Sequence, residues 1–331
     1  MTGTGTIDRQ VEVAARSPGM AAWLAANWLV AAVITFFAVA PFVLPGFVVT
    51  ELTRALIYGL AAISVGFLAG RIGLVSFGHV AYFGIGAYTV LVAHLYGLNE
   101  ALIVWPLAVV LSAFAGCVFG ALALRTRAVA FIMVTLAFAQ MVYFVAIGIR
   151  AIGGADGLSI AARNTLAGFP LASTAVFHWV VLALTALALA MFAALRLTPY
   201  GLALEAIRQN ERRVNAVGLN AGRLQFVAFV LSAAVCGLAG ALVANHYLFV
   251  SPAQLHWIIS GDFLVMATLG GLGIAAGGLY GAITLLLAEL LFAHYTTYWR
   301  IVVGPLVILA VLFLPTGLGP ELQRLMGGRR D

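Results

Sequence analysis

The chain has 331 residues, of which 64% are hydrophobic and only 8% charged, and its mean hydropathy is +1.10. Soluble domains carry roughly 25% charged residues, so a soluble fold is excluded and a polytopic membrane protein is predicted. The formal net charge is +6, and every basic side chain is an arginine. Without lysine, the chain cannot contain a phosphate-binding loop of the form GxxxxGK followed by Ser or Thr, so any ATP used must be hydrolysed by another chain. An arginine excess in a membrane protein indicates orientation rather than nucleic-acid binding.

The first twenty residues are polar and are predicted to form a cytoplasmic N-terminal tail. The apolar run that follows is too long for a signal-peptide core and lacks a clear cleavage site, so we expect it to be retained. Residues 21–318 are predicted to be the transmembrane domain and residues 319–331 a cytoplasmic C-terminal tail. Ten apolar segments have lengths near the roughly 20 residues that a membrane-spanning helix needs. They are residues 21–44, 52–70, 77–95, 102–124, 129–149, 175–195, 224–245, 258–275, 277–293 and 299–314. The predicted fold is therefore all-α, with about ten transmembrane helices.

The arginines support this topology. If the N-terminus is cytoplasmic, ten crossings place only Arg54, Arg150, Arg163 and Arg300 outside, which leaves 13 of the 17 arginines inside (17 minus 4). This asymmetry is the one that the positive-inside rule requires. Changing the count by one crossing would place the central arginine-rich loop and the C-terminal tail on opposite sides of the membrane.

Two stretches are dense in glycine, residues 73–88 and 269–281. Glycine at this density either lets membrane helices pack closely or interrupts a helix that lines a transport pathway. The sequence alone leaves both interpretations open. It also leaves open whether residues 77–95 span the membrane or re-enter it.

Polar residues inside membrane segments are costly and often functional. Ser76 and His79 are three residues apart, but no orienting third group accompanies them, so an intramembrane serine protease is not indicated. The histidines are scattered along the chain, and the two cysteines, Cys117 and Cys236, lie in apolar runs, so no metal site and no disulfide is predicted. No catalytic set emerges. The remaining polar residues are His94, His246 and Glu289, expected near a water interface, Gln140, expected to bond a neighbouring helix, and Asp262, expected near the outer end of its segment.

The polar run at residues 196–223 differs from everything around it. Pro199 is expected to begin a new helix because its ring blocks continuation of the preceding one. Residues 202–217 have a helical pattern with Leu204, Ile207 and Val214 on one face, and Gly218 is the expected terminator. A short charged helix between two spans is either a solvated connector or a docking element for a cytosolic protein.

Together these stretches resemble the LivM-type permease subunits of branched-chain amino-acid ABC importers. The resemblance runs from about residue 42 to residue 318, and the polar loop and the LGGLG stretch are its more specific parts. The passages that carry it are GLVSFGHVAYFGIGAYT at 73–89, residues 134–140 with GGADG at 153–157, YGLALEAIRQNERRVNAVG at 200–218, FVLSAAVCGLAGA at 229–241, LGGLGIAAGGLYG at 269–281 and LPTGL at 314–318.

The resemblance implies that the polar loop is a coupling helix that docks into an ATPase subunit and transmits its closure. The triplet Glu205-Ala206-Ile207, with Gly218 farther on, departs from the EAA-Gly loop of other importer classes. The coupling residues so implied are Tyr200, Gly201, Glu205, Ala206, Arg208, Asn210, Glu211 and Gly218. The residues predicted to line the translocation path are Ser76, Phe77, Gly78, His79, Phe83, Gly84, Gly86, Gln140, Gly270, Gly271 and Gly273.

The resemblance also implies partners and a location. The partners are a second homologous permease subunit, two cytosolic ATPase subunits that carry ATP and Mg²⁺, and an extracytoplasmic substrate-binding protein. The chain itself is expected to bind no cofactor and no nucleic acid. It is expected in the bacterial cytoplasmic (inner) membrane, surrounded by lipid, with both termini cytoplasmic.

The implied substrate is a branched-chain or related small apolar amino acid. Relatives that carry urea, amides or aromatic acids provide an alternative. A further alternative is an ion-coupled secondary transporter, for which Asp262 and Glu289 are the only embedded carboxylates. The sequence shows no Arg–carboxylate pair at one depth of the membrane, so it predicts a low-affinity conduit with glycine-lined and apolar walls around residues 76–86.

Overall fold

The structure is a computed structural model that describes residues 28–293, 295, 299–314, 317–319 and 321. The predicted N-terminal tail, the first seven residues of segment 21–44 and most of the predicted C-terminal tail lie outside the described residues.

The described chain is built almost entirely of helices, as predicted. The helices are α3 (Trp28–Val43), α4 (Gly46–Ile72), α5 (His79–Leu95), α6 (Ala101–Ala123), α7 (Val129–Gly148), α8 (Thr174–Leu197), α9 (Pro199–Ala216), α10 (Ala221–Tyr247), α11 (Trp257–Gly270), α12 (Gly277–Ala293) and α13 (Trp299–Phe313), with 3₁₀ turns η1 (Arg150–Ile152) and η2 (Pro252–Leu255). Each of the ten predicted apolar segments coincides with one helix, and α9 is the helix of the polar run. Five helices, α4, α6, α7, α8 and α10, are long and apolar enough to cross a membrane by length and composition. An all-α polytopic membrane fold is confirmed, and the count of ten crossings stays a prediction.

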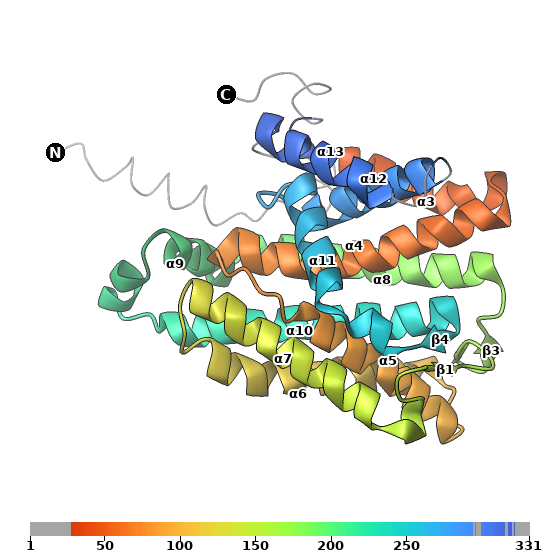
Figure 1. Cartoon of the computed structure of the whole chain (residues 1–331). Helices are drawn as coiled ribbons and strands as arrows, with labels where there is room; N and C mark the ends of the chain where they lie inside the picture. Colours follow the sequence, from red (N-terminus) through yellow and green to blue (C-terminus); the bar gives the residue numbers. More distant parts are fainter. Residues whose placement is uncertain (1–27, 294, 296–298, 315–316, 320, 322–331) are drawn as a thin grey trace.

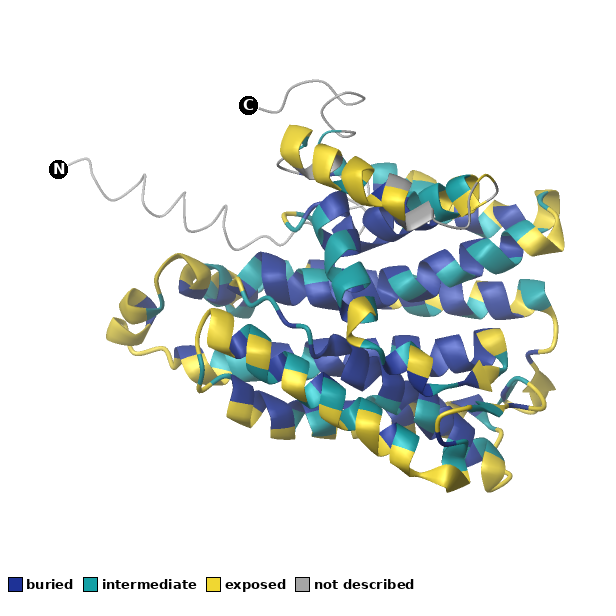
Figure 2. Ribbon diagram, viewed as in Figure 1, coloured by how far each residue is buried: buried dark blue, intermediate teal, exposed yellow. Residues whose placement is uncertain are grey.

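The core of the bundle lies along α4 and α10. In the most apolar windows of these helices, 83% and 72% of the residues are buried, against 28% for α6 and 22% for α7. Helix α4 contacts α8, α11 and α12, helix α10 contacts α5 and α6, and the two central helices contact each other. Helices α6 and α7 form one outer side, and α13 lies on the opposite side (Figure 1). The exposed residues of the helices lie mainly on these two sides and on α9 (Figure 2).

Close approach of backbones holds this core together. A Cβ atom added to Gly86 on α5 would overlap the carbonyl of Gly237 on α10. The same change at Gly281 on α12 would overlap the carbonyl of Met266 on α11, and at Gly278 it would overlap the backbone at Ala62 on α4. Small residues that let helices approach this closely are typical of membrane helix interfaces.

The two ends of the bundle differ. At one end, here called the α9 end, lie α9 and the turns 73–78 and 271–276. At the opposite end, the strand end, two short antiparallel ribbons close the connections (Figure 1). They pair β1 (Leu158–Ser159) with β4 (Phe249–Val250), and β2 (Thr165–Leu166) with β3 (Phe169–Pro170).

Candidate functional site

Helix α9 begins and ends where the sequence predicts. Pro199 occupies the first helical turn, and the hydroxyl oxygen of Thr198 accepts a hydrogen bond from the Gly201 N–H at 3.2 Å, which caps the helix. Its apolar face is the predicted one, since Leu204, Ile207 and Val214 are all buried. Gly218 follows the helix with φ +90°, a left-handed conformation that glycine adopts without strain. Tertiary packing of this face fixes α9 against the bundle.

Helix α9 covers most of the predicted residues 202–217, but it is kinked at Asn210, which the sequence pattern did not predict. Asn210 has φ −161° and ψ 96°, outside the helical region. Its side-chain oxygen accepts a hydrogen bond from the Arg213 N–H at 3.1 Å. The side chain therefore caps a second short helical segment, because asparagine competes well for free N–H groups at a helix start. The coupling residues consequently lie on two segments that meet at Asn210.

Two side chains tie the first segment of α9 to the end of α4. Glu205 forms an ion pair with Arg71. Arg208 donates a hydrogen bond from Nη1 to the Gly70 carbonyl at 2.6 Å. The last carbonyls of a helix lack intrahelical partners and carry partial negative charge. A guanidinium there donates the missing hydrogen bond and also supplies a compensating positive charge. The first segment of α9 is therefore joined directly to the end of α4.

Further polar contacts link the α9 region to other helices. Tyr200 donates a hydrogen bond to the Leu224 carbonyl of α10 at 2.8 Å. Glu211 lies 3.4 Å from Arg127, two residues before the start of α7. At the end of α8, Arg196 donates to the Gly273 carbonyl in the turn between α11 and α12. Sequence reasoning named Glu205 and Glu211 but did not name their partners Arg71 and Arg127, although it placed these arginines on the same side of the membrane.

The outward side of the α9 region is exposed and partly apolar. Arg212 and Arg213 are exposed, and so are three large aliphatic side chains, Leu202, Val217 and Leu219, at 60%, 72% and 48% of their areas. Aliphatic side chains beside a charged surface are typical of protein interaction sites. The polar run is therefore exposed on one side, while α9 packs on its other side against α4, α8 and α10.

The predicted path residues occupy a different region, and most of them are buried. Ser76, His79 and Phe83 are each at most 1% exposed. The His79 ring nitrogen Nε2 is 2.8 Å from the Ser232 hydroxyl, which in turn donates to the Ser64 carbonyl at 2.7 Å. Ser76 accepts instead from the Gly78 N–H at 3.2 Å. His79 thus takes part in interhelical packing, and it does not form a pair with Ser76.

The glycines predicted on the path lie at helix contacts. An added Cβ would overlap the Leu255 side chain at Gly84, the Gly237 carbonyl at Gly86 and the Gly277 carbonyl at Gly270, whereas Gly273 has open space. Gly271 ends α11 with φ +111°. Close packing accounts for these positions, so their place on a pathway stays a prediction. Phe77 is partly buried, and Gln140 has a buried Nε2 atom without a partner among the described residues, so the predicted bond to a neighbouring helix is not made by this atom.

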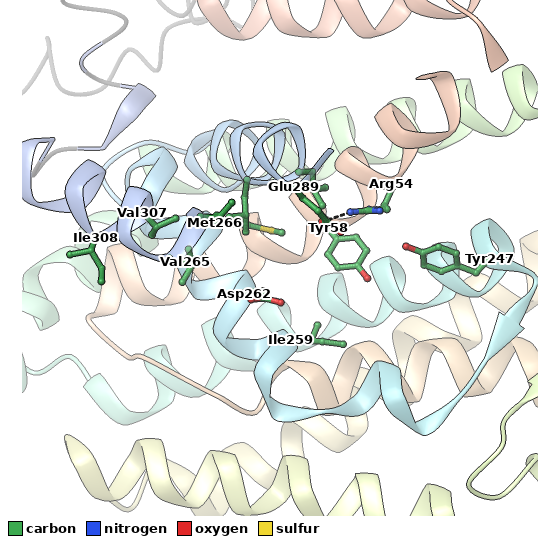
Figure 3. A pocket seen from close by; sticks show the side chains of 14 residues that line it. Arg54, Tyr58, Tyr247, Ile259, Asp262, Val265, Met266, Glu289, Val307 and Ile308 are labelled. Atoms are coloured by element: carbon green, nitrogen blue, oxygen red, sulfur yellow. Dashed lines mark hydrogen bonds and ion pairs between the residues drawn. The ribbon is translucent and has the colours of Figure 1, made fainter. Parts of the chain in front are cut away.

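An Arg–carboxylate pair exists inside the bundle, contrary to the expectation from sequence. Arg54 on α4 is paired with Glu289 on α12, and Glu51 lies 3.2 Å from the same guanidinium. The pair lines a cavity toward the strand end (Figure 3). The sequence could not reveal this contact because the two residues are 235 positions apart.

A helical membrane bundle whose surface helix is fixed to several of its membrane segments is the architecture of a transport permease. Residues 47–312 match the family model described as "branched-chain amino acid transport system / permease component". The chain therefore belongs to this family.

Several curated proteins are similar to this chain. The Escherichia coli high-affinity branched-chain amino acid transport system permease protein LivM is 31% identical over 308 residues, which cover 85% of this chain and 72% of the relative. The E. coli high-affinity branched-chain amino acid transport system permease protein LivH is 31% identical over 151 residues, which cover 44% of this chain and 48% of the relative. The Pseudomonas aeruginosa permease protein BraD is 26% identical across 84% of this chain and 96% of its own length. No solved structure matches this chain.

Proposed function

We propose that this protein is the permease subunit of an ABC importer that moves branched-chain or related small apolar amino acids inward. ATP hydrolysis takes place on separate ATPase subunits. The family and the printed names of the relatives support the substrate class. The observation that carries the proposal is the construction of α9, whose outward side is exposed while Glu205 and Arg208 fix it to the end of α4.

In this proposal, α9 receives the motion of an ATPase subunit and passes it to the bundle. The first segment moves the end of α4 through the Arg71–Glu205 pair, and the Tyr200 hydroxyl moves the start of α10. These are the two central helices, so a rigid-body shift at the surface reaches the core. The kink at Asn210 lets the second segment adjust to the partner surface without displacing the first.

The orientation and the partners follow from the same proposal. The α9 end is cytoplasmic, because the arginines at the helix ends and turns concentrate there, among them Arg71, Arg125, Arg127 and Arg196. The protein resides in the inner membrane with both termini cytoplasmic. Similarity to both LivM and LivH supports pairing with a second homologous permease subunit. Two ATPase subunits and an extracytoplasmic binding protein complete the importer.

The test uses the complete importer in proteoliposomes, with ATP hydrolysis and uptake of leucine measured together. Combined Glu205→Ala and Arg208→Ala substitution is expected to leave assembly intact and to abolish stimulation of ATP hydrolysis by the loaded binding protein. Gln209→Ala is the matched control, since Gln209 is exposed and directly follows Arg208. Unchanged coupling in the double variant would contradict the proposed role of α9.

Competition measurements decide the substrate class. Leucine uptake should be inhibited by isoleucine and valine and not by urea, short amides or benzoate. Uptake that persists without ATP and collapses with an ion gradient would instead favour a secondary transporter.

A further inference from the structure

The ends of α4 and α8 and the turn between α11 and α12 enclose a small pocket at the α9 end of the bundle. Arg71 lies in the last turn of α4 and Arg196 in the last turn of α8, and both line this pocket, here called the arginine pocket. Its volume is about 10 Å³, which is roughly the space that a single water molecule requires. The pocket therefore has room for one small occupant and is too small for a phosphate group or an amino acid.

Both arginines have hydrogen-bond donors that are not used. Arg71 is paired with Glu205 on α9, and Arg196 donates to the Gly273 carbonyl in the turn. The Nε atom of each arginine is buried and has no hydrogen-bond partner among the described residues. A buried N–H group without an acceptor has lost its hydrogen bonds to water and has gained none in exchange, which is costly. The two guanidinium groups thus lack acceptors at the same small pocket.

The charge at the pocket is positive. Among the described residues, Glu205 forms an ion pair with Arg71, and no carboxylate forms one with Arg196, whose partner is a neutral carbonyl. Phe67 and Phe192, both buried, provide an apolar part of the wall. Like charges repel more strongly beside such groups than in water, because the local dielectric constant is lower. An anion between the two arginines would reduce this repulsion.

The start of α12 adds a smaller contribution of the same sign. Gly278, in the first turn of α12, also lines the pocket. The N–H groups at the start of a helix have no intrahelical partners and carry partial positive charge. None of the described residues that line the pocket carries a carboxylate. The wall therefore has the composition of an anion site rather than of a cation site.

We propose that the arginine pocket binds one small inorganic anion, chloride under cellular conditions, between Arg71 and Arg196. The anion accepts hydrogen bonds from unused N–H groups of both guanidinium groups and compensates the charge of Arg196. A monatomic ion fits the volume of the pocket, whereas oxyanions and carboxylates do not. Binding requires neither the transported substrate nor ATP, so the anion site goes beyond the proposed function.

The bound anion joins three parts of the bundle. Arg71 belongs to α4 and Arg196 to α8, and the carbonyl partner of Arg196 lies in the turn that leads into α12. Because Glu205 on α9 is paired with Arg71, an occupied pocket also fixes the arginine that α9 contacts. Removal of the anion is therefore expected to lower the stability of the bundle at its α9 end.

The test measures thermal unfolding of the purified importer complex while potassium gluconate is replaced by potassium chloride at constant ionic strength. Constant ionic strength keeps general screening unchanged, so a rise in the unfolding midpoint reports binding of the ion. The midpoint should rise with chloride concentration and then saturate. Bromide should act similarly, because it is also a monatomic anion.

Two variants alter the pocket in different ways. Arg196→Gln removes one guanidinium, and Ala275→Leu adds volume at a residue that lines the pocket without changing its charge. In both, the chloride concentration that gives half of the midpoint shift should increase by about tenfold or more, equivalent to about 1.4 kcal/mol. Arg125→Gln is the matched control, because it removes an exposed arginine at the same end of the bundle, outside the described lining. The two pocket substitutions are independent, so one of them still tests the site if the other prevents assembly.

Each outcome decides the matter. A chloride response that is lost in the pocket variants and kept in Arg125→Gln would support the anion site. An equal response in all four proteins would place the anion elsewhere in the complex, and no response in wild type would show that the pocket holds only water; either result would overturn the site. Stabilisation by phosphatidylglycerol that is lost in Arg196→Gln, without a chloride response, would assign Arg196 to a lipid phosphate and would also overturn it. A complex that responds to chloride as expected but takes up no amino acid would contradict the proposed function alone.

Discussion

Helix α4 carries an arginine–carboxylate pair near each end, and the two pairs have different surroundings. Arg71 and Glu205 join α4 to the surface helix α9, and the Glu205 side chain is 46% exposed. Arg54 and Glu289 join α4 to α12 inside the bundle, where neither side chain exceeds 28% exposure. An ion pair in contact with water contributes little stability and is easily rearranged, whereas one in apolar surroundings is costly to break. The first is suited to transmitting a movement, and the second is suited to a binding site.

The largest expected effect comes from removing one partner of the interior pair. Arg54→Ala leaves Glu51 and Glu289 without their cation, and we expect a loss of about 2–4 kcal/mol in unfolding free energy, below the upper range for fully buried pairs because Arg54 retains some exposure. Replacing both partners, Arg54→Met with Glu289→Met, should recover part of the stability, because Glu51, which is 26% exposed, is then the one carboxylate of the two that is left without Arg54. Denaturant unfolding of the purified complex in detergent measures both.

Uptake should separate stability from binding in the same two variants. The double methionine variant is expected to fold and still to transport poorly, because the cavity has lost two of the charged side chains that line it. Full uptake by this variant would show that the interior pair serves stability alone.

Exchanging the charges of each pair should distinguish them further. Arg71→Glu and Glu205→Arg are each expected to lower binding-protein-stimulated ATP hydrolysis by about tenfold, or about 1.4 kcal/mol, and the combined exchange should recover most of it. The corresponding exchange of Arg54 and Glu289 should not recover uptake. It places a glutamate at position 54, one turn from Glu51, where like charges repel. Recovery at both pairs would remove the distinction drawn between them.

Salt should change the coupling energies of the two pairs unequally, and these changes should be smaller than the effects of the substitutions above. A double-mutant cycle on Arg71 and Glu205 is expected to give a coupling energy below about 1 kcal/mol. This coupling should decrease between 0.1 M and 1 M salt, because the screening length falls from about 10 Å to about 3 Å. The cycle on Arg54 and Glu289 should retain its coupling energy, since solvent ions have less access to it. Equal salt dependence in the two cycles would indicate that the cavity is freely hydrated.

The sequence predicts the helices of this protein well because length and continuous apolarity determine them locally. Segment 277–293 coincides with α12 at both ends, and Pro199 and Gly218 mark α9 correctly. The arrangement of the arginines on one side could also be predicted, since it depends on charge counts alone. The helices follow from information contained within about twenty consecutive residues, and the sidedness of the arginines follows from the number of segments between them.

The contacts between distant segments could not be predicted. Arg71 and Glu205 are 134 positions apart, and charge patterning gives the side of the membrane without giving the partner. Asn210 has an ordinary helical environment in the sequence, so the kink depends on where the two segments of α9 are held by packing. Gly84 and Gly86 were compatible with a pathway or with close packing, and only the neighbouring backbones distinguish these. Sequence reasoning thus placed the charged residues at the correct end of the bundle, but it did not show which side chains contact each other.

Glu100, at the strand end, is a carboxylate whose partners are a hydroxyl and a backbone N–H instead of an arginine. Its side chain accepts hydrogen bonds from the Thr165 hydroxyl at 2.8 Å and from the Ala167 N–H at 2.6 Å. The Thr165 hydrogen bond, followed by the backbone N–H donors, lowers the pKa of Glu100 below its ordinary value of 4.5, because these donors stabilise the ionised form. The contribution of this contact is therefore present above the ordinary pKa and is lost as pH falls through the lowered one.

We expect protection of the Ala167 amide against hydrogen exchange to decrease over that acidic range, after correction for the intrinsic exchange rate. Glu100→Gln should remove the pH dependence, because an amide does not titrate there. The effect should stay within the β2–β3 ribbon, since protonating Glu100 leaves no arginine unpaired, and this makes it the smallest of the effects. A pH dependence of Ala167 protection that is unchanged in the Glu100→Gln variant would contradict this assignment.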